Sequence, residues 1–216
     1  MVRKTKVFVK RKVRKTFENV YSKKDIECLG EKPFVVISNN CWGGALYRWY
    51  KRPYNSPFVG LFLYGPCYMK MLSNFEHYIK QELIFIDNSK YPDREKTYPL
   101  ALLDDVEVHF THYDSELEAK TKWERRVSRM LEENNFDNYF FKICDRERVT
   151  KEHILAFHKL PLKNRISFAK YDDSELVNEN HIKVKERQKK KKHVPNGKKM
   201  FQLTFLYFDL NEWLLN

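Results

Sequence analysis

The chain has 216 residues, of which 42% are hydrophobic and 15% aromatic, and this is enough for one well-buried domain. Such a composition excludes a disordered chain, and the longest apolar runs are too short to span a bilayer. The net charge of +12 is concentrated in residues 1–24 and 183–199, so the rest of the chain is mildly acidic.

The basic segments are compatible with three interpretations. Tracts such as KERQKKKKH, residues 185–193, are usually solvated loops, but they also bind anionic lipid headgroups or nucleic acid. The even spread of aromatic residues gives nucleic-acid binding no specific support. We therefore expect no specific nucleic acid, and keep peripheral contact with an anionic membrane as the alternative to a loop without a partner.

The four cysteines are scattered, with no CxxC pair and no histidine at metal-ligand spacing from them. This pattern indicates reduced thiols rather than disulfides or a zinc site. The basic first residues lack the apolar segment of a secretory signal. We expect a cytoplasmic protein, at the inner face of the membrane if it docks there, with no metal or other cofactor.

Short apolar runs predict buried strands, and residues repeating at the helical period predict helices. A capping box at Ser115 and Glu118 and a threonine cap at Thr150 mark two helix starts. In chain order, the expected elements are a strand over 33–38, a helix over 45–52, a strand over 59–64, a helix over 65–83, strands over 83–87 and 106–113, a helix over 115–131, a strand over 139–144, a helix over 150–157, a strand over 165–170 and a closing strand over 202–208.

This alternation predicts an α/β fold, a layered single domain with a mixed or largely parallel sheet flanked by helices. We assign residues 1–30 to a basic N-terminal lead-in and residues 31–216 to the single domain, with a Lys-rich loop at about 183–199. Functional sites in such sheets form at the carboxyl ends of strands. The turn that follows residues 33–38 occupies such a place.

That turn reads SNNCWGG, and it contains the first candidate for catalysis, Cys41. A thiol at a helix N-terminus lies near unpaired amides, which typically lower its pKa by about one to two units. The same amides could stabilise an oxyanion. The alternative is that Cys41 is a small buried apolar residue. The neighbouring residues of the turn are candidates for substrate binding: Asn39, Asn40, Trp42, Gly43 and Gly44.

A nucleophilic cysteine needs a base, and the segment VEVHFTHY offers His109 and His112. Their odd spacing places them on opposite faces of a strand, so they are not expected to chelate one metal. His112, at the end of the strand, is the candidate base, whereas His109 and Tyr113 are candidates for substrate contacts. A histidine with only a structural hydrogen bond remains the simpler interpretation.

The helix over 115–131 carries a row of cations in KWERRVSR, and such a row suits a phosphate or a carboxylate. Trp123, Arg125 and Arg126 are the candidates for an anionic substrate pocket. The alternative is a solvated helix face supported by Glu–Lys pairs. The sequence contains no P-loop and no GxGxxG, GxSxG or HExxH motif.

Four segments together resemble the bacterial family grouped as domain of unknown function 1919, whose members are commonly labelled exopolysaccharide biosynthesis proteins. They are FVVISNNCWGGALYRWY, SPFVGLF, VEVHFTHYDSELEAKTKWERRVSRM and ICDRERVTKEHILAFHKLP. The likeness covers about residues 33 to 215. It implies a cytoplasmic α/β protein that acts in cell-surface polysaccharide synthesis, and it implies no particular reaction.

A fainter resemblance, to bacterial proteins predicted to be papain-like cysteine peptidases, implies Cys41 as nucleophile and His112 as base. On these resemblances we expect a transferase or hydrolase of exo-, capsular or lipopolysaccharide synthesis, with a sugar nucleotide or a lipid-linked phosphate as substrate. The alternative is a non-catalytic accessory protein that docks on a membrane or an acidic partner through its basic tracts.

Overall fold

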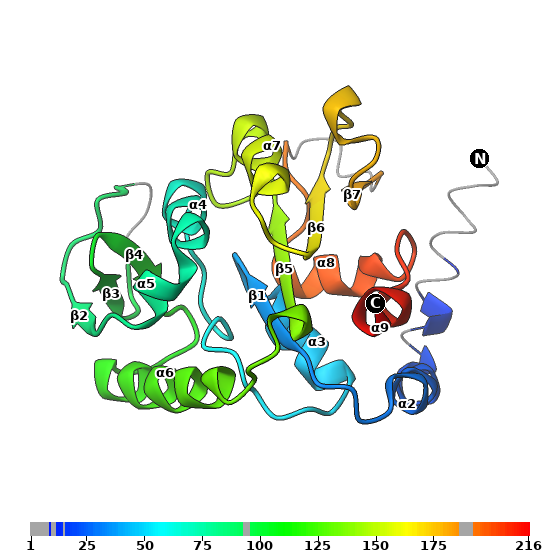
Figure 1. The fold of residues 1–216 in the computed structure, drawn as a ribbon, viewed down its shortest axis with the longest axis horizontal. Helices are drawn as coiled ribbons and strands as arrows, with labels where there is room; N and C mark the ends of the chain where they lie inside the picture. Colours follow the sequence, from blue (N-terminus) through cyan, green and yellow to red (C-terminus); the bar gives the residue numbers. More distant parts are fainter. Residues whose placement is uncertain (1–8, 10–11, 15, 93–95, 186–191) are drawn as a thin grey trace.

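We describe the protein from a computed structural model, which covers residues 9, 12–14, 16–92, 96–185 and 192–216. Its centre is a parallel sheet of four strands in the order β1-β5-β6-β7 (Figure 1). The strands are β1 (Val35–Ser38), β5 (Tyr139–Cys144), β6 (Asn164–Ala169) and β7 (His181–Lys183). The α/β fold, a single layered domain with a largely parallel sheet, is therefore confirmed.

Successive side chains of these strands point to opposite faces of the sheet, and they pack into two apolar cores, one on each face. Val35, Ile37 and Phe141 point into one core, whereas Val36 and Phe140 point into the other. The first core is covered by α4 (Gly65–Ser73), α5 (Phe75–Ile79), α6 (Glu116–Leu131) and α7 (Lys151–Lys159). The second core is covered by α2 (Glu18–Leu29), α3 (Trp42–Trp49), α8 (Gly197–Thr204) and α9 (Leu210–Leu215).

A second, antiparallel sheet lies on the side of α4 and α6 (Figure 1). It consists of β2 (Leu83–Phe85), β3 (Leu100–Leu103) and β4 (Val106–His109). The sequence predicted β2, missed β3, and extended β4 to residue 113. The strand β4 ends at His109 because the following residues form turns. In these turns the amide of Thr111 donates to the His109 carbonyl, and the amide of Tyr113 donates to the Phe110 carbonyl.

Residues 59–64 were expected to form a strand, and that expectation is wrong. The segment is buried and extended, but its only ladder contact within the described chain is a bridge between Phe62 and His109. It crosses the end of β1, where the amide of Leu63 donates to the Asn39 carbonyl at 3.2 Å. The segment therefore joins the edge of the parallel sheet to the antiparallel sheet.

The expected closing strand over 202–208 is also wrong, because these residues end α8 and form the turn before α9. Asn196 caps α8 by accepting a hydrogen bond from the amide of Lys199 at 3.1 Å. Two short 3-10 turns, Phe136–Asn138 and Ser174–Leu176, complete the elements. The helix expected over 65–83 is divided at Asn74 into α4 and α5.

Part of the expected Lys-rich loop, residues 186–191, lies outside the described residues. Of its remainder, β7 ends at Lys183 and α8 starts at Gly197. Among the residues that the structure covers, none of the helices has the length and apolar character needed to cross a bilayer.

Candidate functional site

The turn between β1 and α3 lies at the carboxyl edge of the parallel sheet, where the sequence placed the site. Cys41 is the N-cap residue of α3 and is half-buried. Its Sγ lies 3.9 Å from the Leu61 carbonyl oxygen. The hydroxyl of Thr111 also faces the thiol. The thiol is thus placed between the crossing segment 59–64 and the residues that follow β4.

The expected lowering of the Cys41 pKa is not found. Burial raises the pKa of the thiol, and the Thr111 hydroxyl and the Lys142 ammonium only partly oppose this effect. The resting side chain at neutral pH is therefore the thiol, and any nucleophilic role requires a base to remove its proton.

Alkylation tests this assignment. At pH 7 we expect iodoacetamide to modify the exposed Cys28 before Cys41, with the buried Cys67 and Cys144 protected in the folded protein. The rate at Cys41 should rise with pH through a midpoint above that of an ordinary cysteine, because its pKa is raised. Peptide mass spectrometry of a time course at several pH values measures both quantities. Fastest labelling of Cys41 at pH 7 would contradict the raised pKa.

The candidate base, His112, follows Thr111 directly. Its amide donates to the Gly60 carbonyl at 3.0 Å, so its backbone is fixed near the thiol. Its side chain is exposed, and no hydrogen bond joins it to Cys41 or to any other part of the chain that the structure describes. A base at this position would have to turn toward the thiol to act.

His109 faces the opposite way and is fully buried at the end of β4. Its Nε2 lies 2.7 Å from Oε1 of the buried Glu107. The ring also stacks on Phe62, with centroids 4.4 Å apart. His109 and His112 therefore lie in different environments, but not as opposite faces of one strand, because β4 ends at His109. His109 is not open to a substrate in this conformation.

Beneath the turn lies a buried cation that the sequence analysis did not select. Lys142, on β5, is fully buried, and its Nζ donates to Oδ1 of Asn39 at 3.1 Å and of Asn40 at 3.0 Å. The Asn40 amide in turn donates to Cys144 Sγ at 3.1 Å. Burial lowers the pKa of Lys142. The two asparagines of the turn are therefore occupied in holding this cation. The available signal was one lysine inside the apolar strand YFFKIC.

The other residues of the turn pack the helix against the sheet. Trp42 is fully buried. A Cβ on Gly43 would come within 3.3 Å of both Ser38 and Val36, so the glycine allows α3 to approach β1 closely. Gly44 lies against Val59 in the same way. In this conformation Trp42, Gly43 and Gly44 pack α3 against its neighbours and do not face a substrate.

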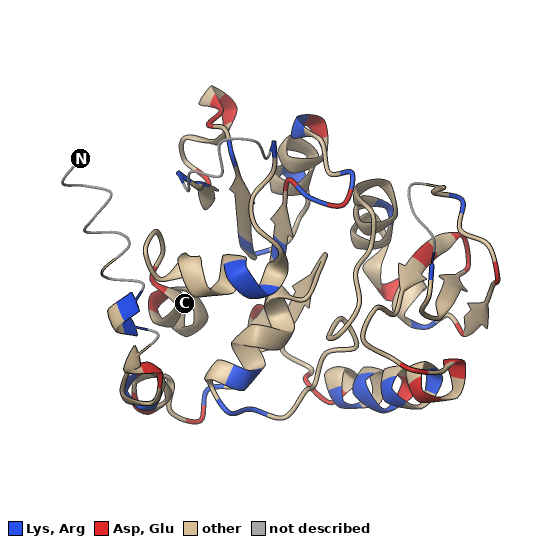
Figure 2. Cartoon of the chain, turned by 180° about the vertical axis from the view of Figure 1, so that it is seen from behind, with Lys and Arg blue, Asp and Glu red and all other residues tan. Residues whose placement is uncertain are grey.

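The expected cationic row on α6 is divided between two sides of the helix. Arg126 is buried and donates to the Val59 carbonyl at 3.0 Å and to the Tyr113 hydroxyl at 2.5 Å. Trp123 lies in the core beside it. Arg125 is exposed, on a helix whose surface mixes both charges (Figure 2). The fixed Arg126 and Tyr113 anchor the crossing segment, whereas Arg125 faces solvent.

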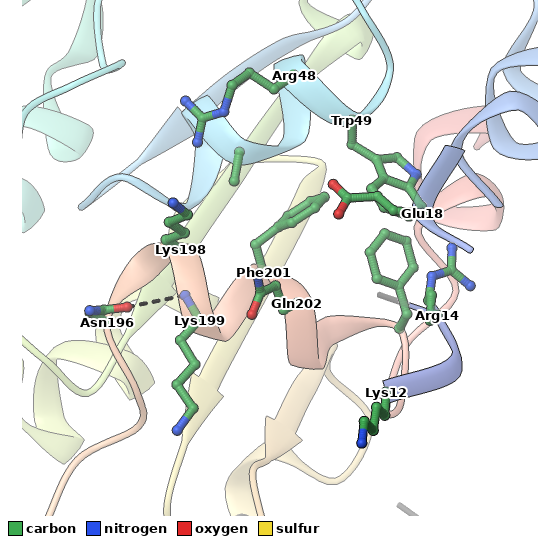
Figure 3. Close-up of a pocket in the computed structure, with 12 residues that line it drawn as sticks. Lys12, Arg14, Glu18, Arg48, Trp49, Asn196, Lys198, Lys199, Phe201 and Gln202 are labelled. Carbon is green, nitrogen blue, oxygen red and sulfur yellow. Dashed lines mark hydrogen bonds between the residues drawn. The ribbon is translucent and has the colours of Figure 1, made fainter. Parts of the chain in front are cut away.

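A groove with a volume of about 740 Å³ lies on the other side of α3, between α3, α8 and the lead-in, and we call it the basic groove (Figure 3). Arg48 projects from α3 and Lys198 from the first turn of α8, where basic residues of both helices are visible in Figure 2. The lining residues are Lys12, Arg14, Glu18, Ala45, Arg48, Trp49, Asn196, Lys198, Lys199, Phe201, Gln202 and Phe205.

Charge and apolar surface are separated in this groove. Trp49 and Phe201 are almost fully buried and form an aromatic floor with Phe205. Arg48 and Lys198 form no salt bridge with any described residue, whereas Arg14 is paired with Asp25 at 2.6 Å. Five cations and one carboxylate line the groove, so it carries a positive potential suited to an anionic ligand.

The groove and the turn are connected by a close contact between two helix starts. A Cβ on Gly197 would lie 2.6 Å from the Trp42 amide nitrogen and 2.9 Å from Asn40 Oδ1, so only glycine permits this approach. Asn196, the residue before it, lines the groove. One end of the basic groove therefore adjoins the turn that carries Cys41.

The chain is similar to a protein family and to a bacterial protein. A family model described as "Domain of unknown function (DUF1919)" matches residues 12–215. A protein of Haemophilus influenzae, described as "Uncharacterized protein", is 35% identical over 190 residues, covering 86% of this chain and 85% of its own. Neither description states an activity.

Proposed function

The chain belongs to the DUF1919 family, and on that premise we propose that it acts in bacterial cell-surface polysaccharide biosynthesis on a phosphate-bearing substrate. The observation that carries the proposal is the basic groove, where Arg48 and Lys198 are not neutralised by any described carboxylate. Its volume is in the range of small-molecule sites. A sugar nucleotide or a lipid-linked sugar phosphate combines the anionic and apolar parts that such a groove would bind.

The chemical step, a transfer or a hydrolysis, would take place at the adjoining turn. The Cys41 sulfur would form a bond to the reacting carbon or phosphorus of the substrate while that atom's bond to the leaving-group oxygen breaks. His112 would accept the thiol proton, since burial keeps the resting thiol protonated, and would return it to the leaving oxygen. The shared end of the groove and the turn supports this division between binding and reaction. A non-catalytic role, with the protein serving only as a binding accessory, is the alternative.

An assay of cell-surface glycan tests the proposal. We expect Arg48→Gln combined with Lys198→Gln to lower glycan output, because each lost cation weakens phosphate binding by about tenfold. The matched control is Lys159→Gln with Lys163→Gln, which removes two exposed cations outside the groove and outside the basic tracts. Protein level is monitored in every strain.

Cys41→Ser and His112→Ala separate the catalytic proposal from the alternative. Loss of glycan in both variants, at normal protein level, supports transfer or hydrolysis at the turn. Unchanged glycan in both, together with a loss in the groove variant, favours the accessory role. Unchanged glycan in the groove variant would refute a phosphate-bearing substrate in the basic groove.

A further inference from the structure

Two histidines face one serine hydroxyl where α7 covers β6 and β7, in the upper part of Figure 1. Ser167 lies on β6 and is fully buried. Its Oγ is 2.7 Å from Nε2 of His158, on α7, and 2.7 Å from Nδ1 of His181, on β7. We call these three side chains the histidine cluster. None of them takes part in the function proposed above.

The outer nitrogen of each ring donates a hydrogen bond. Nδ1 of His158 lies 2.9 Å from a carboxylate oxygen of Glu179, and Nε2 of His181 lies 3.0 Å from the Tyr171 carbonyl oxygen. A carbonyl or an ionised carboxylate oxygen only accepts, so each of these nitrogens carries a proton. In a neutral imidazole the other nitrogen is then bare and can only accept.

The Ser167 hydroxyl cannot satisfy two bare nitrogens. It has one proton to donate, so with two neutral rings one of the 2.7 Å contacts would join two lone pairs. An added proton on either inner nitrogen removes the conflict, because that nitrogen then donates to Oγ while Oγ donates to the other ring. The geometry therefore requires one ring proton more than two neutral histidines hold.

The order serine, histidine, carboxylate is also that of a hydrolase triad, but the surroundings do not suit attack on a substrate. Ser167 is fully buried, and its hydroxyl is enclosed between two rings. The cluster instead ties β7, a strand of three residues at the edge of the parallel sheet, to β6 and α7.

The charged groups around the cluster favour a single added proton. Burial lowers the pKa of His158, Glu179 opposes this effect, and Arg165, 3.6 Å from that carboxylate, adds to it. The charge therefore belongs on the less buried His181, which faces the Asp173 carboxylate. Further ion pairs on these elements are Lys151–Asp173, Lys159–Glu175 and Lys183–Asp172.

We propose that the histidine cluster is a proton-binding site, in which His158 and His181 together hold one imidazolium at neutral pH and attach β7 to α7 through it. In the unfolded chain each histidine has the ordinary pKa of about 6.5, so above that pH the folded chain binds more protons than the unfolded chain. The stabilisation due to this proton is therefore complete below about pH 6.5, and it is lost as the pH rises to the point where the cluster releases the proton.

Nitrogen-15 NMR of the imidazole rings in the full wild-type chain counts the protons directly. At about pH 7.5 an isolated histidine is roughly 90% neutral. We expect one ring of the cluster to be doubly protonated at this pH and the other to be neutral, with its proton on the outer nitrogen. Two neutral rings, or two doubly protonated rings, would overturn the proposal.

His181→Asn gives a second test, through stability. Its amide can donate to Ser167 Oγ without a charge, so the variant needs no added proton. Between about pH 6 and 8.5 we expect the folding equilibrium constant of the wild type, divided by that of the variant, to fall at least about fivefold. Urea titrations at each pH measure this ratio, and a ratio that stays constant would contradict the proposal.

The matched control is His77→Asn, which replaces an exposed histidine on α5. For this control we expect the same ratio to stay within about twofold over the range, because exposed ion pairs contribute little. The proton count by NMR uses the wild-type chain alone, so it decides the question even where His181→Asn does not fold. Neither measurement needs a substrate, and both are therefore independent of the glycan assay.

Discussion

Replacing Trp42 with alanine is expected to lower the free energy of unfolding by about 4 kcal/mol. The side chain is fully buried, and its Nε1 donates to the Thr204 hydroxyl at 3.0 Å. Its ring packs edge-on against Phe201 and Trp213, at centroid distances of 5.8 and 6.2 Å. The substitution would leave a cavity where α3, α8 and α9 meet, and the Thr204 hydroxyl would lose the indole donor while still donating to the Met200 carbonyl at 3.0 Å. Urea unfolding followed by circular dichroism measures the loss.

Trp42→Phe serves as the partial replacement. It keeps one ring in the cavity but cannot donate to Thr204, so we expect a smaller loss of about 2 kcal/mol. For a chain of this length the alanine variant should melt roughly 8–16 °C lower. An unchanged midpoint for Trp42→Ala would show that the indole is not the packing centre of this layer. A stable variant with weakened ligand binding would restore it as a substrate contact.

Trp42 illustrates what the sequence could and could not predict about the site. The sequence pattern of a strand, a tight turn and a helix placed SNNCWGG correctly at the carboxyl edge of the sheet. This succeeded because the spacing of apolar residues and the position of glycines are local signals. The direction of each side chain in the turn depends on α8 and α9, which follow more than 150 residues later. The sequence therefore located the turn, but it did not distinguish the buried Trp42 from the half-buried Cys41.

The difference between local signals and distant contacts also explains which helices and strands were predicted correctly. The strands β1, β5 and β6 and the helix α6 carry clear local signals, including the Ser115 cap, and they form as predicted. Residues 202–208 favour a strand by aromatic content, but Asn196 caps a helix just before them, and Met200, Phe201, Leu203 and Thr204 are buried at helical spacing. The apolar residues of 59–64 are buried in the core, but among the described residues the segment forms only the one bridge to His109 and no strand. Apolar content alone cannot separate these cases.

The basic groove could not be predicted at all from local pattern. Arg48, Lys198 and Arg14 come from three separate segments, and only the packing of α3 against α8 brings the first two to one surface. The burial of Lys142 could be predicted only in part from the sequence. A lysine inside an apolar strand indicates either an exposed edge strand or a buried cation with partners. β5 lies between β1 and β6, and this central position decides for the second.

Lys142→Met is accordingly expected to destabilise the fold by about 2 kcal/mol at pH 7. The methionine fills the space, but the buried side-chain oxygens of Asn39 and Asn40 each lose the ammonium donor, at about 1–3 kcal/mol each. Asn40 Oδ1 keeps the Trp42 amide and Asn39 Oδ1 keeps the weaker Cys144 thiol, so the loss lies at the lower end of this range. Relief of the buried charge offsets part of that loss. The matched control is Lys183→Met on β7, whose ammonium pairs with Asp172 at the surface, and there we expect a change within about 0.5 kcal/mol.

The pH dependence of this difference tests the buried charge itself. Burial lowers the pKa of Lys142 below the ordinary value of 10.5, so above its folded pKa the unfolded chain binds a proton that the folded chain does not. Wild-type stability therefore gains from Lys142 as the pH rises toward 10.5, and the methionine variant lacks that gain. The gap between wild type and Lys142→Met should widen between pH 7 and about 10. Urea titrations at each pH measure it, and a constant gap would mean that Lys142 is buried without a lowered pKa.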